Sequence, residues 1–81
     1  MARYFFNIEN ADIRDTDGYE FASMAEAKCE AVRYAASLIC DSVSTFWDSG
    51  DLNLVVTNER GLVLFSLRMF GTEAPAIRDL R

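Results

Sequence analysis

The sequence predicts an α+β fold of order β-β-α-β-β, in which one long helix packs on one face of a four-stranded, mainly antiparallel sheet. Residues 3–9 and 52–58 carry apolar side chains in alternation, and in residues 62–69 Ser66 and Arg68 mark one face, which is typical of half-buried strands. Residues 23–48 instead repeat apolar side chains with the helical period. Turn signals separate these stretches, so each of them is expected to form one element.

The first predicted strand, residues 3–9, directs alternate side chains toward the helix, namely Tyr4, Phe6 and Ile8. The polar stretch that follows ends in Asp17-Gly18, a dipeptide typical of tight turns. Residues 19–21 then form a short second strand. We expect this strand to pair antiparallel with the first.

The predicted helix begins with a capping box, in which Ser23 caps the first turn and Glu26 lies three residues later. Its polar face is a single stripe made of Glu26, Glu30, Arg33, Ser37, Asp41, Ser44 and Asp48. Its expected core face carries Met24, Ala31, Val32, Ala35, Leu38, Ile39, Val43 and Phe46. Ala27, Ala31 and Ala35 are small enough to let the helix lie close to the sheet.

Lys28 interrupts the apolar face of this helix. One interpretation is that its long aliphatic chain passes the edge of the sheet and carries the ammonium into water. The other is a half-buried cation that pairs with an acidic residue of the first hairpin.

Beyond the helix, Gly50 provides the left-handed residue common just past a helix end, and Gly61 is expected at a positive φ in the turn of a second hairpin. The strands of that hairpin direct one set of side chains inward, namely Leu52, Leu54 and Val56, then Val63, Phe65, Leu67 and Met69. We expect a single domain over residues 1–70 and a flexible tail over residues 71–81.

The other face of the sheet is expected to carry a set of apolar side chains from three strands, namely Phe5, Val55, Leu62 and Leu64. Such a strip on an open sheet face is an interaction signal. We therefore expect this face to be buried against a second copy of the chain in a homodimer, or against another protein. Edge-to-edge pairing of strands is a second route to a dimer.

Composition narrows the classes of partner. The net charge of −5 repels nucleic acid, and no cluster of Lys or Arg offsets it. No apolar run is long enough to cross a membrane, and the start of the chain has no signal-peptide pattern. A cytoplasmic location is the default.

Cys29 and Cys40 lie too far apart on the predicted helix to form a disulfide and are interpreted as small apolar residues at the core margin.

The sequence contains no histidine and no known nucleophile or phosphate-binding motif, so we expect neither an enzyme nor a cofactor. As an alternative, the acidic turn offers a metal or small-ligand site, with Asp12, Asp15, Asp17 and Glu20. Aligning Gly18 with the glycine of a calcium-binding loop puts Ile13 and Met24 at ligand positions, so that register fails. A solvated hairpin turn is the preferred interpretation.

Several short motifs across residues 3–67 resemble a bacterial family of short uncharacterised proteins that opens with an R-Y-F-F motif. They are Arg3-Tyr4-Phe5-Phe6, Asp17-Gly18-Tyr19-Glu20-Phe21, the capped helix from Ser23, and Val56-Thr57-Asn58-Glu59-Arg60-Gly61. Asn7 stands where that family often has histidine. The resemblance implies no activity, because the family is a domain of unknown function. The residues themselves favour a non-catalytic interaction module that self-associates through its sheet, with ligand binding at the acidic turn as the alternative.

Overall fold

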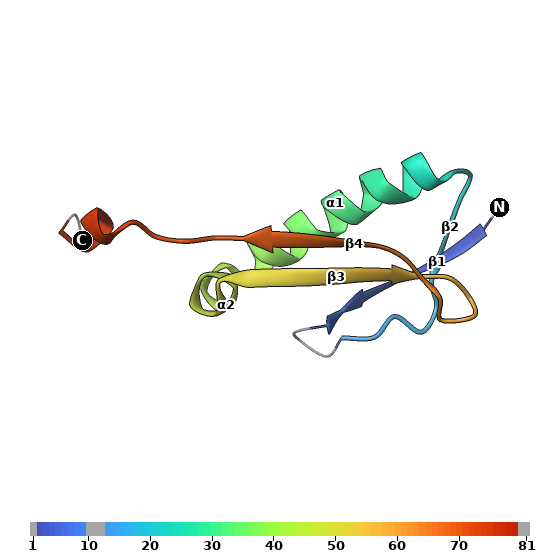
Figure 1. Cartoon of the computed structure of the whole chain (residues 1–81), viewed down its shortest axis with the longest axis horizontal. Coiled ribbons are helices and arrows are strands. Elements are labelled where there is room, and N and C mark those ends of the chain that lie inside the picture. Colours follow the sequence, from blue (N-terminus) through green and yellow to red (C-terminus); the bar gives the residue numbers. More distant parts are fainter. Residues whose placement is uncertain (1, 10–12, 80–81) are drawn as a thin grey trace.

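The computed structural model describes residues 2–9 and 13–79, and it places the main helix across one face of a single sheet (Figure 1). The elements in chain order are β1 (Ala2–Ile8), β2 (Tyr19–Phe21), α1 (Met24–Asp41), α2 (Val43–Ser49), β3 (Asp51–Thr57), β4 (Val63–Phe70) and the 3-10 helix η2 (Pro75–Asp79). The predicted α+β class is confirmed.

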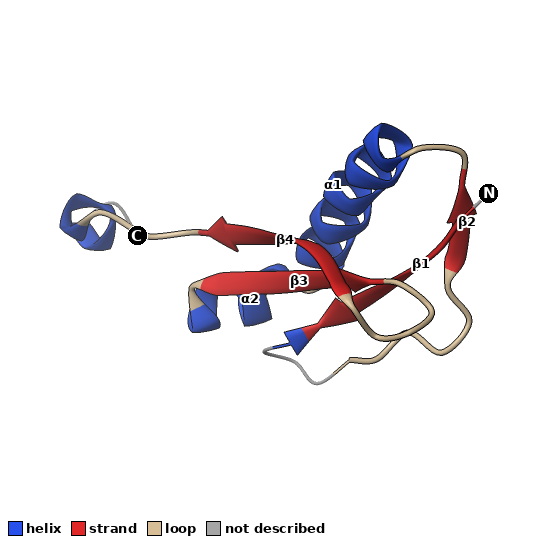
Figure 2. Cartoon of the chain, turned by 45° about the vertical axis from the view of Figure 1, so that its right-hand side comes forward, coloured by secondary structure: helices blue, strands red, loops and turns tan. Residues whose placement is uncertain are grey.

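The sheet has the strand order β2-β1-β3-β4, and all of its pairings are antiparallel (Figure 2). The first residues of β1 pair with β2, and Phe5 to Ile8 pair with β3. The central strands are therefore β1 and β3, whereas β2 and β4 form the two edges. The sequence predicts the hairpins but leaves this order open.

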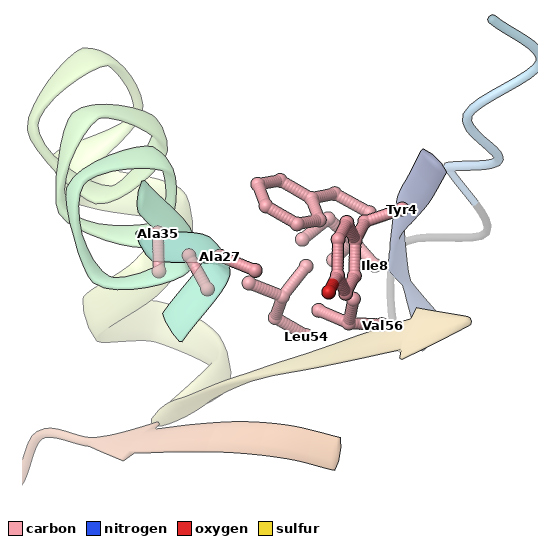
Figure 3. Close-up of a cluster of buried hydrophobic side chains, with 8 residues drawn as sticks. Tyr4, Ile8, Ala27, Ala35, Leu54 and Val56 are labelled. Atoms are coloured by element: carbon pink, nitrogen blue, oxygen red, sulfur yellow. The ribbon is translucent and has the colours of Figure 1, made fainter. Parts of the chain in front are cut away.

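The core lies between β1, β3 and α1 (Figure 3). The sheet contributes the predicted inward side chains, namely Tyr4, Phe6, Ile8, Leu54 and Val56, each of them 5% exposed or less. The helix contributes Ala27, Ala31 and Ala35, which are at most 1% exposed. Small helix residues facing large strand residues allow the close approach that the sequence predicts.

The start of α1 is capped as expected. The Ser23 hydroxyl accepts a hydrogen bond from the Glu26 N–H at 3.2 Å. The Glu26 carboxylate accepts from the Ala22 N–H at 3.5 Å, one residue before the N–H that a standard capping box uses.

The prediction of one uninterrupted helix over residues 23–48 is wrong, because the helix is interrupted at Ser42. Ser42 has φ −132° and ψ 51°, and it ends α1 while its carbonyl accepts the first hydrogen bond of α2. The interruption falls at Asp41-Ser42-Val43-Ser44-Thr45, a run of residues with low helix propensity. The bend brings Phe46 of α2 into the end of the core, where it is 8% exposed.

The expected core face of the helix also needs correction. Met24, Val32 and Val43 are 40%, 47% and 50% exposed, and Leu38 and Ile39 are half-buried. The narrow alanine stripe occupies the contact with the sheet, so larger residues to either side of it remain near the surface.

The turns agree with the sequence at two glycines, since Gly50 and Gly61 adopt φ values of 85° and 80°. Beyond Gly71 the chain leaves the sheet, and η2 stands apart from it (Figure 1). This short helix lies within residues 71–81, for which the sequence predicts a flexible tail. The flexibility of residues 71–81 stays a prediction.

Candidate functional site

The outer edge of β4 is the longer of the two sheet edges in the part of the chain that the structure describes. β4 is eight residues long and ends the strand order, so its outer side has no neighbouring strand there. It contains no proline, and Arg68 is its only charged residue. Long, apolar strand edges without charges or proline are the ones that pair with other chains.

The direction of the free backbone groups on β4 follows from the hairpin. The Gly71 N–H donates to the Gly50 carbonyl at 3.0 Å, so Gly71 directs its backbone groups toward β3. Because backbone direction alternates along a strand, Ser66, Arg68 and Phe70 direct their N–H and C=O groups outward. These groups form the free hydrogen-bonding row of the edge.

Beside this row, the helix-facing side chains of β4 remain partly accessible. Phe65, Leu67 and Met69 pack against the core but are half-buried, because α1 approaches the sheet most closely at β2 and β3 and not at β4. Lys28 of α1 is exposed, as the first interpretation of this residue predicts, and its ammonium lies 6.0 Å from the centroid of the Phe65 ring. The margin of the sheet is thus an apolar strip with one cation beside it.

The other edge of the sheet is protected. β2 is only three residues long, and Glu20 in it pairs with Arg3 of β1 at 2.6 Å. A short edge with a charged pair on it is a poor template for a further strand. Of the two edges, β4 is the one open to association.

The four residues predicted to form an apolar strip on the open sheet face are not brought together. Phe5 and Val55 are half-buried and belong to that face. Leu62 lies before the strand and is 63% exposed, and Leu64 packs against the core instead.

A β-bulge explains this displacement. The register between β3 and β4 shifts at Val56 and Thr57, where Val56 lies opposite Phe65 but Thr57 lies opposite Val63. Leu64 is the extra residue, so the alternation of inward and outward side chains is reset at this point. Val63, predicted to face the helix, is 58% exposed. Residues 62–65 are all apolar, so their sequence contains no alternation that reveals a bulge.

In the folded chain, the acidic turn stabilises the backbone through the side chain of Asp15. One carboxylate oxygen of Asp15 accepts a hydrogen bond from the Phe6 N–H at 3.1 Å. The other accepts from the N–H groups of Asp17 and Gly18, at 3.1 and 3.0 Å. The side chain of Asp15 thereby occupies the place of a strand beside β1, between the Ile8–Ile13 bridge and β2.

Asn7 completes this arrangement. Its side-chain oxygen accepts from the Asp15 N–H at 3.0 Å, and its amide nitrogen lies 3.4 Å from the Val55 carbonyl. Asn7 is 7% exposed and fixes the loop to the sheet. Gly18, with φ 76°, lies against the Phe5 ring, and a methyl group there would lie 2.9 Å from a ring carbon.

The remaining candidates of the acidic turn are dispersed. Asp17 is exposed, Glu20 is held by Arg3, and Asp12 lies outside the described residues. Among the described residues, no three side chains of the His, Cys, Asp or Glu type gather where they could hold a metal ion. Cys29 and Cys40 are free thiols, and both are exposed on α1, not at the core margin.

An aromatic cluster joins β1, β2 and α1 on the helix side of the sheet. The Phe6 ring lies 5.3 Å from Tyr19, 6.0 Å from Phe21 and 5.5 Å from Tyr34, centroid to centroid. Burial in this cluster raises the pKa of Tyr34 above 10.0, and the nearby Tyr19 and Asp15 raise it further. No motif or charge pattern in the sequence points to the Tyr34 phenol.

Comparison with known proteins identifies the family. The model of the domain of unknown function DUF6894 matches residues 3–71, so the chain belongs to that family. No curated protein and no solved structure matches the chain. Within the described residues, no helix is both long and apolar enough to span a membrane.

Replacing Asp15 by alanine is expected to destabilise the fold by about 1–3 kcal/mol, because the partly buried N–H groups of Phe6 and Gly18 lose their acceptor. Urea unfolding followed by circular dichroism measures the change. Asp17→Ala is the matched control, since this exposed carboxylate belongs to the same loop. Equal stability of the two variants would show that the Asp15 hydrogen bonds contribute nothing.

The raised pKa of Tyr34 also predicts a dependence of stability on pH. The folded phenol stays protonated where the unfolded phenol ionises, so its contribution is complete below about pH 10 and is lost as pH rises through the folded pKa. The free energy of unfolding of the native chain should fall more steeply between about pH 9 and 11 than that of Tyr34→Phe. Parallel slopes for the two proteins, measured by urea unfolding, would contradict this assignment.

Proposed function

We propose that this chain is a small, non-catalytic interaction module that forms a homodimer by antiparallel pairing of two β4 edges. The observation that carries the proposal is the free edge of β4, which is eight residues long and has one charged residue. Pairing two such edges about a two-fold axis joins the two four-stranded sheets into one of eight strands. Each edge then satisfies the outward N–H and C=O groups of the other.

The sequence of β4 favours one register, in which the two-fold axis passes through Leu67. On the helix side this register places Leu67 opposite its own copy and Phe65 opposite Met69 of the second copy. The half-buried apolar side chains of each β4 then cover one another. Burial of this row supplies the main driving force for association.

The charge on β4 supports the same register. With the axis at Leu67, each Arg68 lies opposite Ser66 of the other copy. An axis at Arg68 would place two like charges directly opposite each other, which is destabilising. Arg68 also lies 3.3 Å from Asp51 of its own chain, which lowers the net charge of the edge.

The proposal also covers where the protein is located and what kind of organism it comes from. We infer a cytoplasmic protein, because both exposed cysteines are free thiols, and such thiols suit a reducing compartment. The opening motif Arg3-Tyr4-Phe5-Phe6 supports a bacterial source.

A proline at position 66 tests the edge pairing. The Ser66 N–H points away from β3, so proline removes an intermolecular donor and leaves the ladder between β3 and β4 intact. By symmetry the dimer loses two hydrogen bonds. We expect the dissociation constant of the dimer to rise roughly 30-fold, with thermal unfolding of the monomer little changed.

Light scattering on a sizing column over a range of concentrations measures this change. Ser66→Thr is the control, because it keeps the N–H and suits a strand. A native chain that remains monomeric at all concentrations would overturn the proposal. So would a Ser66→Pro variant that dimerises as tightly as Ser66→Thr.

A cross-linking experiment tests the register. Leu67 pairs with itself at a position without direct hydrogen bonds, where Cα atoms lie about 4.5 Å apart, within the range of a disulfide. We expect Leu67→Cys, in a Cys29→Ser and Cys40→Ser background, to form a covalent dimer under mild oxidation. Non-reducing electrophoresis detects this product.

Met69→Cys in the same background is the matched control. In the proposed register, Met69 lies about four residues, or roughly 14 Å, from its own copy, too far for a disulfide. Efficient cross-linking at position 69 with none at position 67 would exclude an axis at Leu67.

A further inference from the structure

We propose that the pocket beneath the bend between α1 and α2 binds a small neutral amphiphile with an aliphatic body and one hydroxyl or amide head. The pocket has a volume of about 390 Å³. It lies where the end of α1, the start of α2 and the adjacent parts of β1 and β3 meet, and it is separate from the outer edge of β4. We call it the elbow pocket.

The interruption of the helix creates this space. Because Ser42 leaves helical geometry, the last turn of α1 and the first turn of α2 diverge above the sheet. Phe46 and Ile8 line the elbow pocket, and both are buried.

The walls of the elbow pocket are apolar and partly open to water. They are formed by Ile8, Ile13, Leu38, Ile39, Phe46 and Leu52. Leu38, Ile39 and Leu52 are half-buried, and Ile13 at the mouth is 44% exposed. Two hydrogen bonds between the backbones of Ile8 and Ile13, of 2.9 and 3.0 Å, hold that mouth residue in place.

The polar groups of the elbow pocket lie on its α2 side. They are Ser42, Thr45, Ser49 and Asp51. The Ser49 hydroxyl already donates to the Phe46 carbonyl at 3.2 Å, and the Asp51 carboxylate lies 3.3 Å from Arg68. The hydroxyls of the exposed Ser42 and Thr45 are suited to hydrogen-bond the head of a ligand.

Size and charge define the class of ligand. An apolar cavity of about 150 Å³ holds benzene, so 390 Å³ corresponds to about 15 non-hydrogen atoms. Among the described residues that line the pocket there is no Lys or Arg, and Asp51 is acidic. Arg68 beside the lining already pairs with Asp51, so a carboxylate head would enter without a counter-ion of its own, which disfavours fatty acids and favours neutral molecules.

Octan-1-ol and octanoate at pH 7 are the probes, since they share one chain length and differ in the charge of the head. We expect octanol to shift the amide NMR signals of Leu38, Ile39, Phe46 and Leu52 in a saturable way. Octanoate should bind at least tenfold more weakly, because its charge is not compensated in the pocket. Shifts that spread over the surface without saturating, or equal affinity for both probes, would overturn the proposal.

Three tryptophan variants, one of them a control, test whether binding occurs in the elbow pocket. Ile39→Trp fills the cavity, and Cys40→Trp adds the same side chain one residue further on, at an exposed position outside the lining. Thr45→Trp blocks the exposed side of the pocket without entering the core, so it tests the site even if Ile39→Trp disturbs folding. We expect octanol affinity to fall at least tenfold in Thr45→Trp and to be unchanged in Cys40→Trp. Native affinity in Thr45→Trp would exclude this site.

Discussion

The close contact between α1 and the two central strands determines the rest of this structure. Ala27, Ala31 and Ala35 project only methyl groups, so the helix backbone can approach the large side chains of β1 and β3. This places the helix over the middle of the sheet, where all three alanines are almost completely buried. One helix of this width cannot cover four strands, and β4 remains at the margin. The accessible apolar strip beside its edge is therefore a consequence of the helix position.

On the β1 side of the sheet, side chains bind the backbone groups that have no neighbouring strand. Between Ile13 and Tyr19 the chain bulges away from β1, which would leave the Phe6 N–H without a partner. The Asp15 carboxylate supplies that acceptor, and Asn7 fixes the loop through the Asp15 N–H. Side chains thus replace a missing stretch of strand, and this margin is closed. The asymmetry between the two margins is what makes β4 the available one.

Sequence reasoning succeeded where apolar and polar residues alternate and failed where they do not. Tyr4, Phe6 and Ile8 define one face without ambiguity, and burial confirms it. Residues 62–65 are all apolar, so hydrophobicity could not locate the bulge at Leu64. The helix interruption at Ser42 had a signal in local propensity, but the hydrophobic period continues through it and concealed the bend. The role of Asp15 depends on distances between segments that no local pattern contains.

The elbow pocket and the β4 edge both bear on the free energy of unfolding of this chain. A domain of 81 residues buries only about 60–65% of its unfolded surface and has a small margin of stability. An unfilled apolar pocket lowers that margin further, because its walls lose dispersion contacts. Any molecule that binds only the folded chain adds stability, about 2.7 kcal/mol at a concentration 100 times its dissociation constant. A dimer paired through β4 and a ligand in the elbow pocket would each select the folded chain over the unfolded one, so both proposed equilibria would be thermodynamically linked to folding.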